Sequence, residues 1–266
     1  MFSPAVSTRV SDGAGSCDRA ILRRFVVVAA TLVLICSASG CATLPPGSVR
    51  DPRDHFERFN RAMFEFNTAL DHAVMRPVAR AYVERVPGPI RTGVSNFLTN
   101  LHYTTTIGND ILQARFRDFA GDVARLVVNT TLGIGGLLDP ASALRLARHD
   151  RDFGQTLGEW GVHTGSYLVL PLLGPSDVRD AIARVPDRYM TVDGIVNDTT
   201  LSLSLFGVGA VDERANALPA DNAINSAFDP YAFVRSAWFQ LRDYKVHEGQ
   251  KNYVPNLPPL GADDPQ

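Results

Sequence analysis

One stretch of the sequence decides the class of fold: Phe56-Glu57-Arg58-Phe59-Asn60-Arg61-Ala62-Met63-Phe64-Glu65-Phe66-Asn67-Thr68-Ala69-Leu70. Five of its apolar residues recur at intervals of three and four, and these are Phe56, Phe59, Met63, Phe66 and Leu70. That spacing places them along one side of an α-helix, with the polar residues off the stripe. We therefore predict an amphipathic helix, with Asp51 as its N-cap and Pro52 at its first position.

The helical period continues through most of the chain. Pro77 is expected to kink or restart the helix beyond Leu70, and Pro87-Gly88-Pro89 is expected to end it. Asp139-Pro140 is expected to start a new turn, and Asp229-Pro230 to open a last helix with a stop at Gly249. The other helices are predicted at 94–101, 107–112, 117–132, 178–185 and 201–218.

The region from Arg148 to Gly174 is the least helical. Its apolar run Tyr167–Leu173 fits either a buried strand or a segment against lipid, and periodicity does not choose between them. Pro171 argues against a central strand. Gly174-Pro175-Ser176 is expected to cap the next helix. With no internal repeat and no clear β-hairpin, the sequence predicts a mainly α fold with few or no strands.

The N-terminus has the pattern of a secretory signal peptide. Arg23 and Arg24 precede the apolar run Phe25–Ile35, which is too short to cross a bilayer, since crossing needs roughly 20 apolar residues. The following Ala38-Ser39-Gly40-Cys41 resembles a bacterial lipobox, in which the cysteine is lipid-modified, typically with palmitate among its acyl chains. Because Ala38 stands where Leu is usual, an ordinary signal peptide cut near Ala38 or Gly40, with Cys41 free, is the alternative.

These features divide the chain into four parts. We expect a lipoprotein-type signal peptide over 1–40, a flexible tether over 41–50, one folded domain over 51–250 and a disordered tail over 251–266. Cleavage before Cys41 leaves 226 residues with a formal net charge of −4, which argues against a nucleic-acid partner. Cys41 is then the one remaining cysteine, so disulfides, structural zinc and thiol catalysis are excluded from the expected mature chain.

A search for catalytic motifs finds none, so we predict no enzyme activity, no cofactor and no metal site. The cluster His149-Asp150-Arg151-Asp152 is the one group that a metal or proton-transfer site could use, and a solvated turn is its default interpretation. His163 lies near Ser166, but no orienting acid or oxyanion hole accompanies the pair.

The order and spacing of short motifs strongly resemble the MlaA (VacJ) family of outer-membrane lipoproteins. The resemblance runs from about Asp51 to about Gly249. The motifs include Phe59-Asn60-Arg61, Phe66-Asn67, Arg76-Pro77-Val78-Ala79, Asn129-Thr130-Thr131-Leu132-Gly133, Phe153-Gly154-Gln155-Thr156-Leu157-Gly158, Tyr167-Leu168-Val169-Leu170-Pro171, Gly174-Pro175-Ser176 and Asp229-Pro230-Tyr231.

The resemblance implies a ring-shaped, multi-helix domain with an amphipathic central channel. It also implies a place on the periplasmic side of the outer membrane, within the inner leaflet and beside a trimeric porin, with a lipid anchor at Cys41. Members of the family remove phospholipids that have strayed into the outer leaflet and pass them to a periplasmic carrier of the MlaC type. This retrograde transfer maintains the lipid asymmetry of the outer membrane.

The resemblance also suggests candidate residues for the channel or its motifs. They are Phe59, Asn60, Arg61, Phe66, Asn67, Gly133, Gly135 and Gly136. The alternatives are that Phe59, Met63 and Phe66 only fill a core and that the glycines, instead of permitting a hinge or close backbone approach, form an ordinary helix end. The apolar runs Tyr167–Leu173 and Leu201–Val211 face either lipid or a core.

Two other functions stay open from the sequence. One is a structural or adhesion lipoprotein of the envelope without transport activity. The other is a lipid hydrolase facing the periplasm, which ranks last because no candidate nucleophile is present.

Overall fold

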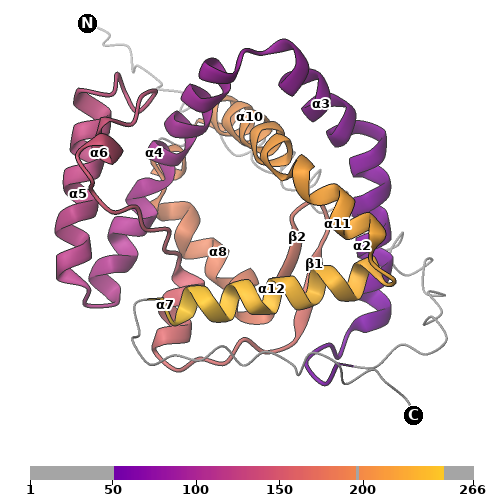
Figure 1. Ribbon diagram of the computed structural model, residues 1–266. Coiled ribbons are helices and arrows are strands. Elements are labelled where there is room, and N and C mark those ends of the chain that lie inside the picture. Colours follow the sequence, from indigo (N-terminus) through magenta and orange to yellow (C-terminus); the bar gives the residue numbers. More distant parts are fainter. Residues whose placement is uncertain (1–50, 196–197, 249–266) are drawn as a thin grey trace, which may run out of the picture.

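The computed structural model describes residues 51–195 and 198–248, which form a ring of helices around a central opening (Figure 1). The predicted mainly α fold is confirmed, and the strands are limited to one small two-stranded sheet in the described part of the chain. The predicted signal peptide, tether and tail, together with Cys41, lie outside the described residues.

The first arc of the ring is α2 (Glu57–Leu70), followed by η1 (Asp71–Met75) and α3 (Arg76–Arg85). The predicted start at Asp51-Pro52 is wrong, because the Asp51 carboxylate accepts the N–H of Arg53 at 2.9 Å within a turn, and the helix begins at Glu57. The restart at Pro77 is confirmed. Proline stands in the first turn of α3, where no N–H is needed, and the π-helical turn η1 precedes it.

One long helix, α4 (Gly88–Leu112), replaces the two short helices predicted over 94–112. The apolar stripe is interrupted there by polar residues, several of which are buried and hydrogen-bonded. Tyr103 donates to the Asp122 carboxylate at 2.7 Å, and Thr106 is 4% exposed. The helix packs against α5 (Phe116–Thr131), which begins within a residue of the predicted position, and α6 (Pro140–Ala143) follows, with Asp139 as its predicted cap.

A hairpin occupies the least helical region, after the short helix α7 (Phe153–Glu159). Strands β1 (Tyr167–Leu170) and β2 (Gly174–Asp177) pair antiparallel, with Tyr167 opposite Asp177 and Leu170 opposite Gly174. The expectation of a helix cap at Gly174-Pro175-Ser176 is therefore wrong. The cap of α8 is Asp177, whose side chain accepts the N–H of Asp180 at 2.9 Å.

The remaining helices complete the ring. They are α8 (Val178–Met190), α9 (Val192–Ile195), α10 (Thr199–Ala217), η2 (Leu218–Ala220), α11 (Asp221–Ser226) and α12 (Pro230–Val246). Asp198 and Asp229 cap α10 and α12 by accepting the N–H three residues on. The last described helix ends at Val246, and the predicted stop at Gly249 lies outside the described residues.

The apolar core is small and sits where α2, β1 and α12 meet. Its buried members are Met63, Tyr167, Val169, Tyr231 and Phe239. Tyr231 packs edge-on to Phe64 and to Tyr167, with ring centroids 5.8 and 6.1 Å apart. A wall one or two helices thick buries little apolar surface, so many large apolar side chains remain exposed around the ring. On α8 they form one stripe, consisting of Val178, Ile182, Val185 and Tyr189.

Among the described residues, no helix has both the length and the apolar character needed to cross a bilayer.

Candidate functional site: the central channel

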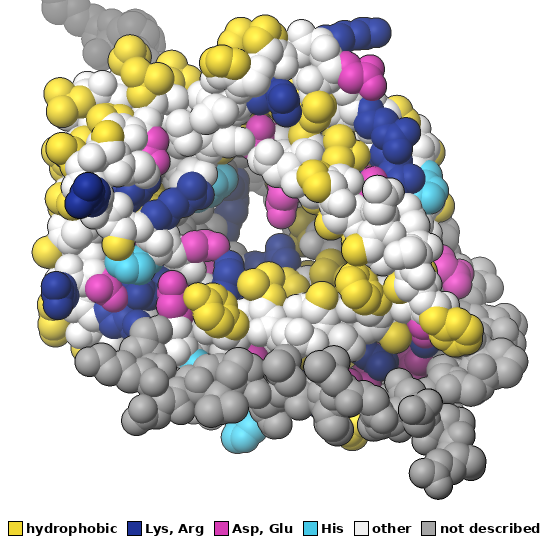
Figure 2. Space-filling view, in the orientation of Figure 1, with side chains coloured by type: hydrophobic (Ala, Val, Ile, Leu, Met, Phe, Trp, Pro, Cys, Tyr) yellow, Lys and Arg dark blue, Asp and Glu magenta, His cyan; other side chains and the backbone are white. Residues whose placement is uncertain are grey.

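Two adjoining cavities run through the ring, with volumes of about 750 and about 300 Å³. They share four lining residues, which are Leu172, Leu173, Ala210 and Glu213. Figure 2 shows the opening in the middle of the molecule, with basic side chains to its left and below it and an acidic side chain on its right border beside hydrophobic ones. Because they share these residues, the two cavities are adjacent, and together they are called the central channel below.

One part of the channel wall is apolar. Leu172 and Leu173 come from the β1–β2 turn, and Leu205, Phe206 and Ala210 come from α10. The side chain of Leu172 is 65% exposed and that of Phe206 is 59% exposed, although both are large and apolar. Apolar surface left open inside a channel suits an apolar ligand.

The other part of the wall carries charge. Arg184 and Arg188 are one turn apart on α8, and Arg148 comes from the segment after α6. His102, His149 and three carboxylates, those of Asp150, Asp212 and Glu213, line the same cavity. The channel is thus amphipathic, with apolar and charged surfaces in one continuous space.

Buried polar contacts hold the segment that carries Arg148. His149 Nδ1 lies 2.9 Å from Asp122 Oδ2, and Arg151 forms ion pairs with Asp110 and with Asp118. Burial, together with the neighbouring Asp122 carboxyl, raises the pKa of Asp110 to about 6, although Arg151 acts in the opposite direction. The predicted cluster at 149–152 is therefore a structural network rather than an isolated solvated turn.

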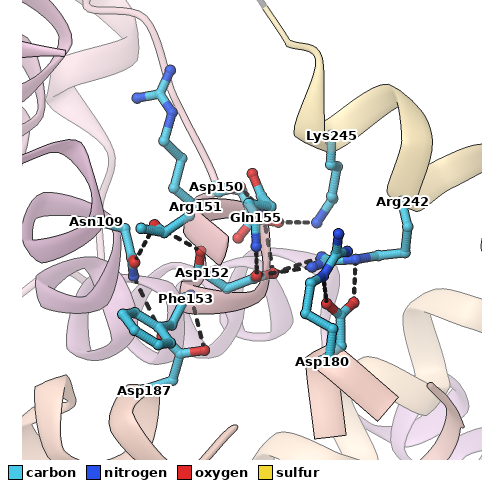
Figure 3. A network of polar contacts seen from close by, with 12 residues as sticks. Asn109, Asp150, Arg151, Asp152, Phe153, Gln155, Asp180, Asp187, Arg242 and Lys245 are labelled. Carbon is cyan, nitrogen blue, oxygen red and sulfur yellow. Dashed lines mark hydrogen bonds and ion pairs between the residues drawn. The ribbon is translucent and has the colours of Figure 1, made fainter. Parts of the chain in front are cut away.

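The ring is closed by a second network, which joins α12 to α7 and α8 (Figure 3). Arg242 on α12 forms hydrogen bonds to both oxygens of Asp152, at 2.7 and 2.9 Å, and an ion pair with Asp180 at 2.5 Å. Burial alone would raise the pKa of Asp152, but the hydrogen bonds from Arg242 outweigh it and lower that pKa to about 2. On the other side, Asp187 accepts the N–H of Phe153 at 2.9 Å.

Two of the predicted motif residues serve the framework of the ring. Asn60 is fully buried and accepts the N–H of Val169 at 2.9 Å while donating to Tyr167 O at 3.0 Å. Its amide thus pairs with the free edge of β1 as another strand would. Arg61 forms hydrogen bonds to Asp229 at 2.7 and 3.1 Å and stacks on the ring of Tyr231 at 4.4 Å.

Asn67 is the predicted residue that borders the channel, because it lines the smaller cavity. Phe59 and Phe66 line neither central cavity, and each is 39% exposed. The stripe of α2 is therefore divided: Met63 enters the small core, whereas the two phenylalanines remain partly open.

The three predicted glycines form the turn that follows α5, away from both central cavities. A Cβ at Gly133 would collide with the backbone oxygens of Asn129 and Leu138. Gly136 has φ of +95°, and a Cβ there would lie 2.5 Å from that of Asn100 on α4. Close approach is thus found at Gly133 and Gly136 but not at Gly135, where a Cβ would meet nothing within 4 Å, and the contact of Gly136 with Asn100 joins this turn to α4.

Comparison with known proteins decides the family. The profile of the MlaA lipoprotein family matches residues 52–245. The chain belongs to the MlaA lipoprotein family. The MlaA family is not one of known enzymes, and the absence of catalysis in this chain stays a prediction.

Individual proteins are also similar to this chain over most of its length. The chain is 34% identical to the "Intermembrane phospholipid transport system lipoprotein MlaA" of Escherichia coli over 224 residues. This alignment covers 83% of this chain and 86% of that protein. It is 34% identical over 217 residues to the protein of the same name from Haemophilus influenzae, covering 80% and 87%. An uncharacterized protein of Rickettsia typhi is 35% identical over 196 residues, covering 73% and 78%.

A solved structure is also similar, with a TM-score of 0.67 and 35% sequence identity. The match covers 74% of this chain and all of that chain, and the structure is described as "Structural basis for maintenance of bacterial outer membrane lipid asymmetry". The fold of this chain is therefore shared with that structure.

Sequence reasoning missed the charged lining of the channel. Arg184 lies in the helix predicted over 178–185, but Arg188 lies beyond its predicted end, and only the observed helix α8 places the two on one face. Nothing local, however, indicates that this face points into a channel rather than into solvent.

Proposed function

We propose that this MlaA-family protein carries phospholipids through its channel, removing them from the outer leaflet of the outer membrane for retrograde transport and so maintaining lipid asymmetry. The observation that carries the proposal is the amphipathic wall of the channel. A phospholipid needs an apolar surface for its acyl chains and a polar surface for its headgroup. Leu172, Leu205 and Phe206 supply the first, and Arg148 and Arg184 supply the second.

The exposed surface of the ring supports the proposal that the protein lies in a membrane leaflet. Large apolar side chains are exposed around it, including Ile182 on α8 at 65% and Leu132 just after α5 at 69%. Exposed apolar patches of this kind mark contact with a membrane or a partner. We assign the protein to the periplasmic side of the outer membrane, anchored by lipid at Cys41.

The partners follow from the same proposal. A trimeric porin would hold the ring in the leaflet, and a periplasmic carrier of the MlaC type would accept the lipid. Passive passage through the channel needs no nucleophile and no nucleotide, so the downstream carrier and its energy-using transporter would set the direction of transfer.

The first test is to block the channel. Ala210 lies at the junction of the two cavities, so Ala210→Trp should fill the passage, and phospholipid should accumulate in the outer leaflet. The matched control is Ala223→Trp, at an exposed position of α11 that lines neither cavity. Outer-leaflet phospholipid is measured by its accessibility to phospholipase added to intact cells. Equal accessibility in wild type and Ala210→Trp, with both proteins folded, would contradict transport.

The second test concerns the anchor and the partners. Cys41→Ala should shift the protein out of the outer-membrane fraction and raise outer-leaflet phospholipid. Unchanged fractionation would contradict the lipid anchor. Purification from detergent-solubilised outer membranes should recover a trimeric porin and phospholipid. Recovery of neither would favour a structural or adhesion role.

A further inference from the structure

The larger cavity is lined by side chains of both charges, which restricts the kind of headgroup that it suits. Three arginines and three carboxylates line it: Arg148, Arg184, Arg188, Asp150, Asp212 and Glu213. Such a wall offers partners to both charges of a zwitterion, whereas an anionic headgroup without an ammonium group leaves the carboxylates without a ligand partner.

Two of the three carboxylates are already engaged. Asp212 is 6% exposed and accepts hydrogen bonds from Ser95 at 2.5 Å, Asn216 at 3.2 Å and Tyr82 at 3.3 Å. Asp150 forms an ion pair with Lys245 at 2.6 Å. Their charges are therefore used within the protein and are weak candidates for contact with a ligand.

Glu213 differs from both. It is exposed, it lines both cavities, and it makes no hydrogen bond or ion pair within the described residues. Its neighbour Arg214 pairs with Asp71 and Asp221 instead. One carboxylate at the junction of the cavities thus remains available to a cation.

The arginines likewise divide into those that are paired within the protein and those that are available to a ligand. Framework arginines such as Arg61 and Arg242 each contact two carboxylates. Arg148, by comparison, has one contact, a hydrogen bond of 3.3 Å to Thr99, and Arg184 has no hydrogen bond or ion pair among residues 51–195 and 198–248. Both are exposed to the cavity, so their guanidinium groups are available to an anion.

We propose that the channel prefers phospholipids with a zwitterionic headgroup. Arg184 and Arg148 contact the phosphodiester, and Glu213 contacts the ammonium group. This inference rests on the proposed transport function. A guanidinium matches phosphate oxygens with paired N–H donors, and a carboxylate is the natural partner of an ammonium. Leu172 and Leu173 line both cavities together with Glu213. These leucines can therefore contact the acyl chains of a phospholipid whose headgroup contacts Glu213.

The test uses the full-length mature protein in nanodiscs that contain equal amounts of phosphatidylethanolamine and phosphatidylglycerol. Lipid bound to the purified protein is quantified by mass spectrometry. Because Glu213 is exposed, an ion pair between it and the ammonium group should stabilise the bound lipid only modestly. We expect the wild-type protein to bind phosphatidylethanolamine over phosphatidylglycerol at about three times their ratio in the membrane. Glu213→Gln should return the ratio to that of the membrane and leave the total bound lipid unchanged.

The arginines should act differently. The double variant Arg148→Gln/Arg184→Gln should bind less of each lipid, because phosphatidylethanolamine and phosphatidylglycerol both contain the phosphodiester that the arginines contact. Matched controls are Glu65→Gln and Arg58→Gln, which change exposed charges on α2 that line neither cavity. Circular dichroism confirms that each variant is folded.

The outcomes separate the two proposals. A wild-type ratio equal to that of the membrane, or a ratio unchanged by Glu213→Gln, overturns the headgroup preference. In either case, loss of bound lipid in Ala210→Trp would leave the transport function standing. Absence of bound lipid in the wild-type protein would overturn both.

Discussion

The side-chain oxygen of Asn67 accepts the backbone N–H of Leu172 at 2.8 Å, while its amide nitrogen donates to Leu170 O at 2.9 Å. One side chain on α2 thus holds both ends of the turn that places Leu172 and Leu173 in the channel. Leu172 has φ of +67°, which a non-glycine residue seldom adopts, so the turn depends on such outside support.

We therefore predict that Asn67→Ala loosens the apolar wall more than it destabilises the fold. Loss of two hydrogen bonds should lower the free energy of unfolding by about 2 kcal/mol. Phospholipid should accumulate in the outer leaflet, as measured by phospholipase access in intact cells. Wild-type asymmetry in a folded Asn67→Ala variant would show that the position of the turn is irrelevant to transport.

Replacement of Asn60, in contrast to that of Asn67, should mainly destabilise the fold. It is fully buried, and its loss leaves Val169 N–H and Tyr167 O without a partner at the free edge of β1. Since an unpaired buried polar group costs about 1–3 kcal/mol, Asn60→Ala should destabilise the fold by roughly 3 kcal/mol or more. Urea denaturation measures this loss. A variant as stable as Asn67→Ala would contradict the role given to the strand edge.

The glycines of the turn after α5 form a matched pair for mutation. Gly135→Ala meets no atom within 4 Å and suffers only the strain of φ +69°, which costs about 1 kcal/mol. Gly136→Ala adds a collision with Asn100 to a φ of +95°, so its thermal midpoint should fall further. Equal midpoints would mean that Asn100 moves aside freely. Reduced lipid transport at unchanged stability would instead favour the hinge interpretation of the sequence.

Acid stability should depend on two carboxyls near α7 in opposite ways. Asp152 has a pKa of about 2, below the ordinary value of 3.8, so its stabilising effect is complete above 3.8 and is lost as the pH falls towards 2. Burial raises the pKa of Asp187 to about 6, so the folded state binds the proton more tightly than the unfolded chain does. Its protonation therefore stabilises the fold below 3.8, and this contribution disappears as the pH rises through 6.

Urea titrations at a series of pH values distinguish the two groups. Asp187→Asn should flatten the loss of stability between pH 4 and 6, whereas Asp152→Asn should weaken the fall in stability below pH 4. Because 32% of the Asp152 side chain is exposed, we expect its effect to be moderate. Identical pH profiles for wild type and both variants would contradict the assigned shifts.

The sequence predicted the helices well because their signal is local. The stripe of α2, the restart at Pro77 and the caps at Asp139 and Asp229 each depend on residues within a turn or two. Two features were missed or left open because distant partners decide them. The polar middle of α4 stays helical because Tyr103 bonds to Asp122 on α5, and Tyr167–Leu170 is a strand because Asn60 pairs with its edge.

The candidate residues follow the same division. Motif order was sufficient to select Asn60, Arg61 and Gly136, but their roles in the framework became visible only through contacts such as that between Arg61 and Asp229, 168 residues apart. Arg184 and Glu213 were absent from the candidates, since a charged residue on a helix is usually solvated and nothing local distinguishes a channel from the outside.

By itself, therefore, the sequence determined the helical class, most helix positions and membership of the MlaA family, because hydrophobic period and motif spacing are properties of neighbouring residues. Only the tertiary structure decided which helix faces enclose the channel, how β1 pairs, and which charges remain available within it. Those features depend on closure of the ring by contacts such as Arg242 with Asp152, which join segments that the local pattern cannot relate.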